Sequence, residues 1–222
     1  MIDLHTHTFL SDGELGPAEL AHRAEHAGYR AIGITDHADA SNLDDLISAL
    51  VQFVRETQPF MKIRIIPGVE LTHVPPGQIG GLVRRARQLG ARLVLLHGES
   101  VCEPVALGTN RAGIEAGIDV LAHPGIISEE EEVRLAAANG VCLEISARPR
   151  HGLGNGRVVS LAREAGAAMV INSDAHSPSD ILTPNGREPV AFGSGLTADE
   201  MERINKTMIS LVEKLVPSTF FA

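Results

Sequence analysis

Five times along this chain, a helical pattern ends at a glycine and a short apolar run begins within a few residues. The five glycines are Gly28, Gly90, Gly117, Gly140 and Gly166. Glycine just beyond a helix can adopt the left-handed backbone conformation that turns the chain back into a strand. The apolar runs are almost uninterrupted, which is typical of parallel strands buried on both faces. The repetition therefore predicts successive βα units around a parallel sheet.

Seven apolar runs fit strands of this kind. They are Ile2–His5, Ala31–Thr35, Ile63–Val69, Leu93–Leu96, Asp119–Ala122, Val141–Ile145 and Met169–Asn172. An eight-unit barrel usually needs about 250 residues, so seven units suit a chain of 222 residues. The strands alone are compatible with either an open sheet or a closed barrel.

The chain shows no linker or break in composition, so we predict a single domain over residues 1–222. Pro17 suits the start of a first helix, and a last helix is expected from about Thr197 to Val216. Capping boxes are predicted where Ser128 precedes Glu131 and where Thr197 precedes Glu200. We expect the Gly- and Pro-rich stretch 181–196 to be a loop that could act as a lid or an interface.

A side chain able to bind metal or transfer protons stands at the C-terminal end of every predicted strand. In chain order these are His5, His37, Glu70, His97, His123, Glu144 and Asp174, with His7 and His176 two positions beyond the first and the last. Barrel enzymes assemble their chemistry at this end of the strands. A ring of converging side chains therefore favours a closed barrel over an open sheet.

Imidazole and carboxylate ligands suit Zn²⁺, Mn²⁺ or Fe²⁺, and the set exceeds what one ion needs. A single histidine at a strand end is more often structural, but the joint pattern predicts two or three divalent transition-metal ions. His22 and His26 lie four apart on the first helix, and we interpret them as surface residues. His73 and His151 fall in loops from which they could reach a substrate.

Charge and composition limit the classes of partner that the protein can bind. The net charge is −9 and aromatic residues make up 3% of the chain, which disfavours phosphate-backbone binding and base stacking. No apolar run is long enough to span a bilayer, and the start of the sequence does not look like a secretory signal. Cys102 and Cys142 cannot form a disulfide framework. We therefore expect a cytoplasmic protein without membrane contact, and the charge favours a small-molecule substrate over nucleic acid as its partner.

An ordered series of motifs resembles the PHP family (polymerase and histidinol phosphatase). The motifs are His5-Thr-His7, Ser11-Asp12-Gly13, Thr35-Asp36-His37, Gly68-Val-Glu70, His97-Gly98, Ala122-His123-Pro124 and Ser173-Asp174-Ala-His176. They run over residues 1–180 in the family's order, leaving a C-terminal loop and helix at 181–222. The resemblance implies a distorted seven-stranded (β/α)7 barrel of the TIM-like, PHP type.

The resemblance also implies three metal positions and a reaction. The first would be held by His5, His7, Glu70 and Asp174, the second by Glu70, His97 and His123, and the third by Asp12, His37 and His176. Glu70 and Asp174 would serve catalysis by holding the metals around a bridging hydroxide, the nucleophile toward a phosphate ester. The implied activity is that of a metal-dependent phosphoesterase, most simply a small-molecule phosphomonoesterase similar to histidinol phosphatase.

Residues around the expected ligands suggest supporting roles. Arg148 or Arg150, beyond the sixth strand, is predicted to bind the substrate phosphate, because a guanidinium fits phosphate in a bidentate way. Arg111 and Arg187 are weaker candidates. Glu144 is predicted to orient a metal-bound histidine through that residue's other ring nitrogen.

Two other functions remain open. A phosphodiesterase or nuclease of PHP or TatD type, or an amidohydrolase, would also begin with H-x-H; amidohydrolases usually place a lysine where this chain has His97. Thr35-Asp36-His37 and the Ser173 motif fit PHP better than TatD. The third hypothesis is a non-enzymatic RNA-binding barrel related to the ribonuclease P subunit. The net charge of −9 and the full ligand set count against it.

Overall fold

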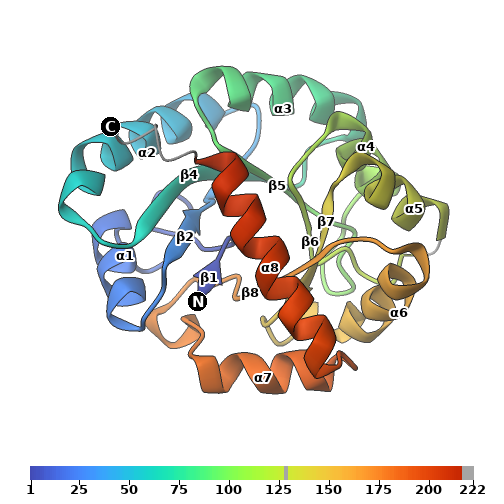
Figure 1. The fold of residues 1–222 in the computed structure, drawn as a ribbon. Helices are drawn as coiled ribbons and strands as arrows, with labels where there is room; N and C mark the ends of the chain where they lie inside the picture. Colours follow the sequence, from blue (N-terminus) through green and yellow to red (C-terminus); the bar gives the residue numbers. More distant parts are fainter. Residues whose placement is uncertain (128–129, 217–222) are drawn as a thin grey trace.

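The computed structural model of the protein describes residues 1–127 and 130–216. A parallel sheet curls into a nearly closed barrel with helices on its outside (Figure 1). Seven strands follow one another around the barrel in chain order: β1 (Ile2–Asp3), β2 (Ala31–Ile34), β4 (Arg64–Leu71), β5 (Leu93–His97), β6 (Val120–Ala122), β7 (Cys142–Ser146) and β8 (Met169–Asn172). The predicted TIM-like α/β barrel of PHP type is confirmed.

Hydrogen bonds between the two ends of the chain close the barrel. Thr6 and Ala175 form a parallel bridge between the segments that follow β1 and β8. The amide of Leu4 donates to the side chain of Asn172 at 2.9 Å, and the amide of Ser173 donates to Asp3 at 3.2 Å. A barrel without free edges has no exposed strand to pair with another chain.

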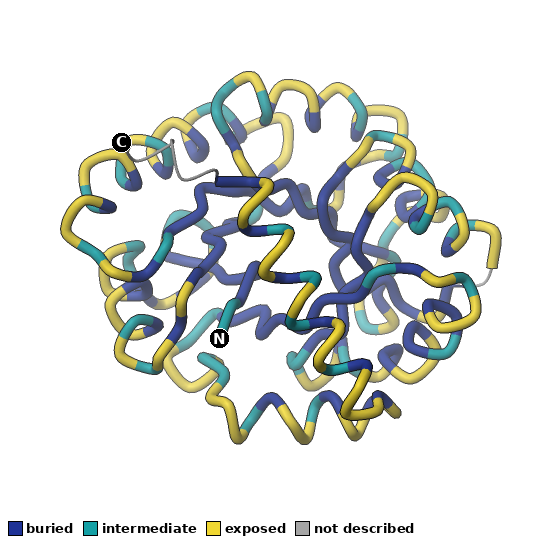
Figure 2. Tube along the Cα trace, viewed as in Figure 1, coloured by how far each residue is buried: buried dark blue, intermediate teal, exposed yellow. Residues whose placement is uncertain are grey.

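Helices cover the strands. Within the described residues they are α1 (Pro17–His26), α2 (Leu43–Thr57), α3 (Pro76–Leu89), α4 (Thr109–Ala116), α5 (Glu130–Asn139), α6 (Asn155–Ala165), α7 (Pro184–Gly193) and α8 (Ala198–Leu215). Five of them, α1, α3, α4, α5 and α6, end at the glycines of the predicted pattern. All five glycines have positive φ, as expected of residues that end helices in the left-handed conformation. Every residue of β2, β5, β6, β7 and β8 is buried, whereas the outer faces of the helices are exposed (Figure 2).

Two elements differ from the sequence-based prediction. The stretch 181–196 is not only a loop, because α7 forms there with Pro184 in its first turn and Thr183 capping its N-terminus. Proline is tolerated at that position because its missing N–H has no helical partner to lose. A two-residue strand, β3 (His37–Ala38), pairs with β4 and was not predicted, since two residues show no periodicity.

Helix α8 crosses the end of the barrel at which the strands begin (Figure 1). Its predicted start is confirmed: the Thr197 hydroxyl accepts from the amide of Glu200, and the Glu200 carboxylate accepts from the amide of Thr197. The other predicted capping residue, Ser128, lies outside the described residues. Among the helices described, none is long and apolar enough to cross a membrane.

Candidate metal centre

The strand-end side chains gather at the C-terminal mouth of the barrel. A cavity of about 250 Å³ opens there. It is lined by Asp12, His37, Thr72, His73, His97, Glu103, His123, Arg148, His151, Asp174 and His176. His5, His7 and Glu70 lie beneath this cavity, buried in the barrel. The predicted convergence of these residues is what the folded chain shows.

Four of these residues form the deepest group. Nε2 of His5 lies 3.3 Å from Oε2 of Glu70 and 3.7 Å from Oδ1 of Asp174. Nε2 of His7 lies 3.6 Å and 3.3 Å from the same two oxygens. His5 and His7 follow β1, Glu70 lies within β4, and Asp174 follows β8. Closure of the barrel between β1 and β8 therefore brings this group together.

Glu70 also faces a second group, on the side of β5 and β6. Its Oε1 lies 3.4 Å from Nε2 of His123. The ring of His123 packs edge-on against that of His97, with centroids 4.4 Å apart. His97 ends β5, and His123 directly follows β6. The Glu70 carboxylate thus stands between the two groups of histidines.

A third group lies nearer the solvent. Oδ1 of Asp12 is 3.5 Å from Nε2 of His37, and its Oδ2 is 3.3 Å from Nε2 of His176. Pairing of β3 with β4 places His37 directly beside Glu70, with Nδ1 of His37 2.8 Å from Oε2 of Glu70. The ring of His7 stacks on that of His176 at 4.0 Å, which joins this group to the deepest one.

Glu144, on β7, contacts the ligand candidates without lining the cavity. Its Oε1 lies 2.8 Å from Nδ1 of His5 and accepts from the side chain of Asn172 at 2.8 Å. Its Oε2 accepts from the backbone amide of His123 at 2.9 Å. The contact with Glu144 thus involves Nδ1 of His5 and leaves the other ring nitrogen, Nε2, facing Glu70.

Several buried polar atoms in the deepest and second groups have no hydrogen-bond partner among the described residues. They are Nε2 of His5, both ring nitrogens of His7, both carboxylate oxygens of Glu70, Nδ1 of His123 and Oδ1 of Asp174. Buried polar atoms normally have partners, because each one left without costs about 1–3 kcal/mol. Nitrogen and oxygen donors aimed at shared points fit divalent transition metals. The residues therefore suit the metal ions that the sequence predicts.

The buried carboxylates of the centre need positive charge nearby. Burial disfavours ionisation of Glu70, yet His5, His37 and His123 hold the pKa of its carboxyl well below the usual range. Burial works against a charged His5, but Glu144, Glu70 and Asp174 raise the pKa of its imidazole well above 6.5. The buried carboxylates are thus stabilised by cations, which protons or metal ions can supply.

Other histidines in the centre are held neutral. Burial, together with the nearby His37 and His5, lowers the pKa of His7 well below its usual value. Burial lowers the pKa of His97 to about 4, although Glu70 acts in the opposite direction. Neutral imidazole is the form that binds metal.

Two candidate ligands have unusual backbone conformations. The φ angles of His123 and Asp174 are 28° and 55°, in the left-handed region that non-glycine residues seldom adopt. Such conformations cost on the order of 1–3 kcal/mol each and persist where surrounding structure enforces them. Here the turn after each strand directs the side chain into the barrel mouth.

Of the predicted phosphate-binding arginines, the structure brings only Arg148 to the cavity. Its guanidinium donates to the backbone carbonyl of Asp174 at 3.0 Å and to Nδ1 of His176 at 2.6 Å. Arg150 is exposed and does not line this cavity. Arg111 pairs with Glu115 on the outside of α4, and Arg187 lies at the other end of the barrel, on α7.

Glu103 lines the cavity but was missed from the sequence. It lies between β5 and α4, and its carboxylate is 3.1 Å from Nε2 of His97, 3.3 Å from Nε2 of His73 and 3.6 Å from Nε2 of His151. His151, considered only as a loop histidine, is buried and stacks on His123 at 4.0 Å. The sole signal for Glu103 was a carboxylate six positions after His97, because irregular loops show no periodicity.

The sequence of the chain is similar to a known domain family and to archaeal proteins. The sequence model of the PHP domain matches residues 3–139. An uncharacterized protein of Methanocaldococcus jannaschii, MJ1295, is 45% identical over 202 residues, covering 90% of this chain and 92% of that protein. Ribonuclease P protein component 3 of Methanosarcina barkeri is 27% identical over 208 residues, covering 85% of this chain and 79% of that protein.

Two solved structures share the fold. A chain in the structure of archaeal ribonuclease P with mature tRNA superposes with a TM-score of 0.71 at 19% identity, covering 97% of this chain and 91% of that one. A protein assigned as a histidinol phosphatase from Listeria monocytogenes superposes with a TM-score of 0.55 at 15% identity, covering 82% of this chain and 97% of that one. At these identities the likeness concerns the fold alone.

Proposed function

Because the chain belongs to the PHP domain family, we propose that it is a metal-dependent phosphoesterase that hydrolyses a small phosphomonoester. Family members share a barrel on which different functions occur, so the proposal rests on the site rather than on the fold. We also propose that residues 1–222 make up one PHP domain, because β7 and β8 complete the barrel that the matched residues begin.

The proposed ligands are those implied by the sequence motifs. His5, His7, Glu70 and Asp174 would hold one metal ion, and Glu70, His97 and His123 a second. Asp12, His37 and His176 would hold a third. When bound, zinc, manganese or iron ions would lower the pKa of water and neutralise charge that develops on a transferring phosphoryl group. Glu144 would orient His5 through the 2.8 Å contact to its Nδ1.

Arg148 would bind the phosphate group. Its guanidinium lies at the cavity wall beside Asp174 and His176, so it can extend toward an anion at the mouth. A cavity of about 250 Å³ accommodates a phosphate with a small organic group more readily than a polymer. The net charge of −9 also disfavours approach of a long polyanion.

One observation supports the proposal: buried nitrogen and oxygen donors on β4 and just after β1, β6 and β8 converge without hydrogen-bond partners among residues 1–127 and 130–216. Keeping them unpartnered is costly for folding alone. A metal-binding function explains why the chain retains all of them.

A second candidate function is RNA binding within an assembly such as ribonuclease P. The 27% identity to ribonuclease P protein component 3 and the fold likeness to a chain of the archaeal enzyme favour it. Cleavage of a phosphodiester would use the same donors, so a nuclease is a third possibility within the same chemistry.

The experiment that separates these functions combines metal analysis with activity and binding assays. We expect two or three transition-metal ions per chain and phosphate release from a sugar, amino-alcohol or nucleotide monophosphate. Chelation should abolish this release. Cleavage of short oligonucleotides without phosphate release would replace the phosphomonoesterase by a nuclease. Binding of a tRNA precursor by a protein that is inactive on both substrate classes would favour the ribonuclease P role.

A further inference from the structure

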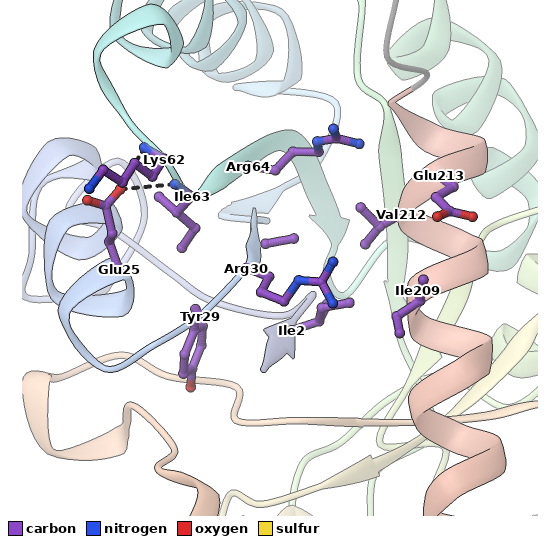
Figure 3. A pocket seen from close by; sticks show the side chains of 11 residues that line it. Ile2, Glu25, Tyr29, Arg30, Lys62, Ile63, Arg64, Ile209, Val212 and Glu213 are labelled. Atoms are coloured by element: carbon purple, nitrogen blue, oxygen red, sulfur yellow. Dashed lines mark hydrogen bonds between the residues drawn. The ribbon is translucent and has the colours of Figure 1, made fainter.

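A second hollow lies at the opposite end of the barrel from the metal centre. It has a volume of about 450 Å³ and lies where β1, β2 and β4 begin, beside α8 (Figure 3). A neighbouring hollow of about 290 Å³ shares Ile2, Arg30 and Ile209 with it. We call the two hollows together the basal cleft. Their combined size falls within the range of small-molecule pockets, about 300–1,000 Å³.

Arg187, on α7, is a buried cation in the wall of the basal cleft. Its side chain is 6% exposed. Its guanidinium donates to Asn205 at 2.6 Å and contacts the sulfur of Met208 at 3.1 Å, but its Nε has no partner among the described residues. Burial lowers the pKa of Arg187, although the more distant Asp3 acts in the opposite direction.

A buried guanidinium normally has a carboxylate beside it, because removing an unpaired charge from water is costly. In residues 1–127 and 130–216, no carboxylate oxygen forms a salt bridge with Arg187. Arg187 therefore has no carboxylate in direct contact within the described residues, and Asp3 acts on it only from a longer distance.

Three more cations line the basal cleft. Figure 3 shows Arg64, at the start of β4, and Arg30, directly before β2, extending toward α8, with Lys62 at the far side. The Arg30 and Lys62 side chains make no hydrogen bond or salt bridge with the described residues, and Arg64 donates only to the carbonyl of Val216 at 3.1 Å. These groups remain available to a ligand.

Two carboxylates also line the larger hollow. Glu25 already accepts hydrogen bonds from the amides of Lys62 and Ile63, at 2.8 and 2.9 Å. Glu213 is exposed on the outer side of α8. The smaller hollow is lined by Arg30 and Arg187, and by no carboxylate of the part of the chain that the structure describes. In a protein of net charge −9, this gathering of cations favours an anion.

We infer that the basal cleft binds a phosphate-bearing small molecule. The phosphate lies between Arg30 and Arg187, because guanidinium groups match phosphate oxygens in a bidentate way. The remainder of the ligand packs on Ile209 and Val212, which line the larger hollow from α8. This site is separate from the metal centre and does not depend on the activity proposed for it.

Tyr29 supplies a local reporter for the test. It lines the larger hollow and is the one tyrosine of a chain that has no tryptophan. The full-length, metal-containing protein is titrated with inorganic phosphate and with n-butylphosphonate, whose C–P bond resists hydrolysis, while tyrosine fluorescence is recorded. We expect saturable changes with both probes and tighter binding of butylphosphonate, which carries the apolar group.

Two variants test the cations and the apolar wall. The double variant Arg30→Gln/Arg187→Gln should weaken binding about tenfold or more, since hydrogen bonds to charged groups are among the strongest. Ile209→Glu places a carboxylate on an exposed turn of α8 beside Arg30 and should weaken binding similarly. Because Ile209 is 37% exposed, this second variant should fold even if the double variant does not.

Two controls match these changes. Arg55→Gln/Arg84→Gln alters the net charge equally at exposed positions on α2 and α3, and Arg148→Ala removes the cation at the metal centre. In both, the probe concentration at the midpoint of the tyrosine-fluorescence titration should stay within about twofold of wild type, because Tyr29 lines the basal cleft and not the metal centre. Equal weakening in the surface double variant would mean that only net charge matters. Weakening in Arg148→Ala alone, or an unchanged fluorescence in wild type, would overturn the inference.

Discussion

At the scale of single residues, Glu70 occupies the central place. Its two oxygens lie within 3.6 Å of ring nitrogens of His5, His7, His37 and His123, which come from three different parts of the chain. Asp174 also lies near histidines of all three groups, but its contact with the second group, to His123, is longer, at 3.9 Å. A change at Glu70 therefore affects every proposed metal position that it borders.

We predict that Glu70→Gln lowers metal content and activity more than His37→Ala does. Changing an outer partner of a metal ligand typically costs about 10- to 100-fold, so the loss at Glu70 should exceed about 100-fold. His37 would touch only the outermost position. Metal analysis by mass spectrometry, together with phosphate release, measures both effects. Normal metal content and near-normal turnover in Glu70→Gln would refute the shared-ligand role.

We predict that Arg148→Ala reduces kcat/KM for the best phosphomonoester by about one to two decades. A hydrogen bond to a charged group is worth roughly 1.5–3 kcal/mol. Arg150→Ala, two residues away and exposed, is the matched control and should stay within about twofold of wild type. If both variants retain full efficiency, the metal ions alone hold the phosphate.

The sequence predicts those site residues whose position follows directly from a strand. The predicted ligands lie at strand ends, and the strand ends of a barrel meet at its mouth regardless of the conformation of the loops. Glu103 and the buried state of His151 could not be predicted in this way. Their placement depends on the path of the loops after β5 and β7, which local sequence does not determine.

At the scale of elements, short segments with few internal contacts were the hardest to predict. β3 has two residues and exists because its neighbour β4 extends to Leu71. α7 contains two prolines and three glycines within or beside it, so local propensity disfavours it. Contacts of Arg187 with α8 hold it in place, and these are tertiary interactions.

The N-terminus of α8 gives a pH-dependent prediction. Hydrogen bonds from Arg163 and from the amide of Thr197 lower the pKa of Glu200 to about 2. A lowered carboxyl pKa stabilises the folded state above the unfolded-state pKa, near 4.3, and this contribution is lost as the pH falls toward 2. Wild type should thus lose more stability between pH 5 and pH 3 than Glu200→Gln does.

Denaturant unfolding at several pH values measures this difference. Glu213→Gln on the same helix is the control, because Glu213 makes no hydrogen bond or salt bridge with the described residues, and it should follow the wild-type pH profile. Parallel pH profiles for wild type and Glu200→Gln would contradict the lowered pKa of Glu200.

The Thr197 hydroxyl at the start of α8 gives a separate prediction. Thr197→Ala should lower the free energy of unfolding by about 1 kcal/mol at pH 7, the usual effect of losing a capping hydroxyl.

At the scale of the whole molecule, metal binding should stabilise the barrel. A ligand that binds only the folded state adds about 2.7 kcal/mol when its concentration is 100 times Kd. We therefore predict that Zn²⁺ or Mn²⁺ raises the Tm of metal-stripped protein. The double variant His22→Ala/His26→Ala removes the exposed pair on α1 and should show the same rise. A rise that vanishes in this variant would place the metal on the surface.

The closure of the barrel has a consequence for how the protein is made. During synthesis, His5 and His7 emerge from the ribosome early, whereas Asp174 follows only after nearly the whole barrel has been translated. The hydrogen bond that seals the ends joins residues 168 positions apart, Leu4 and Asn172. A nascent chain that stops before β8 therefore lacks Asp174, one of the proposed metal ligands around Glu70. Full metal loading would then mark a finished chain, and interrupted translation would yield fragments that cannot acquire the whole centre.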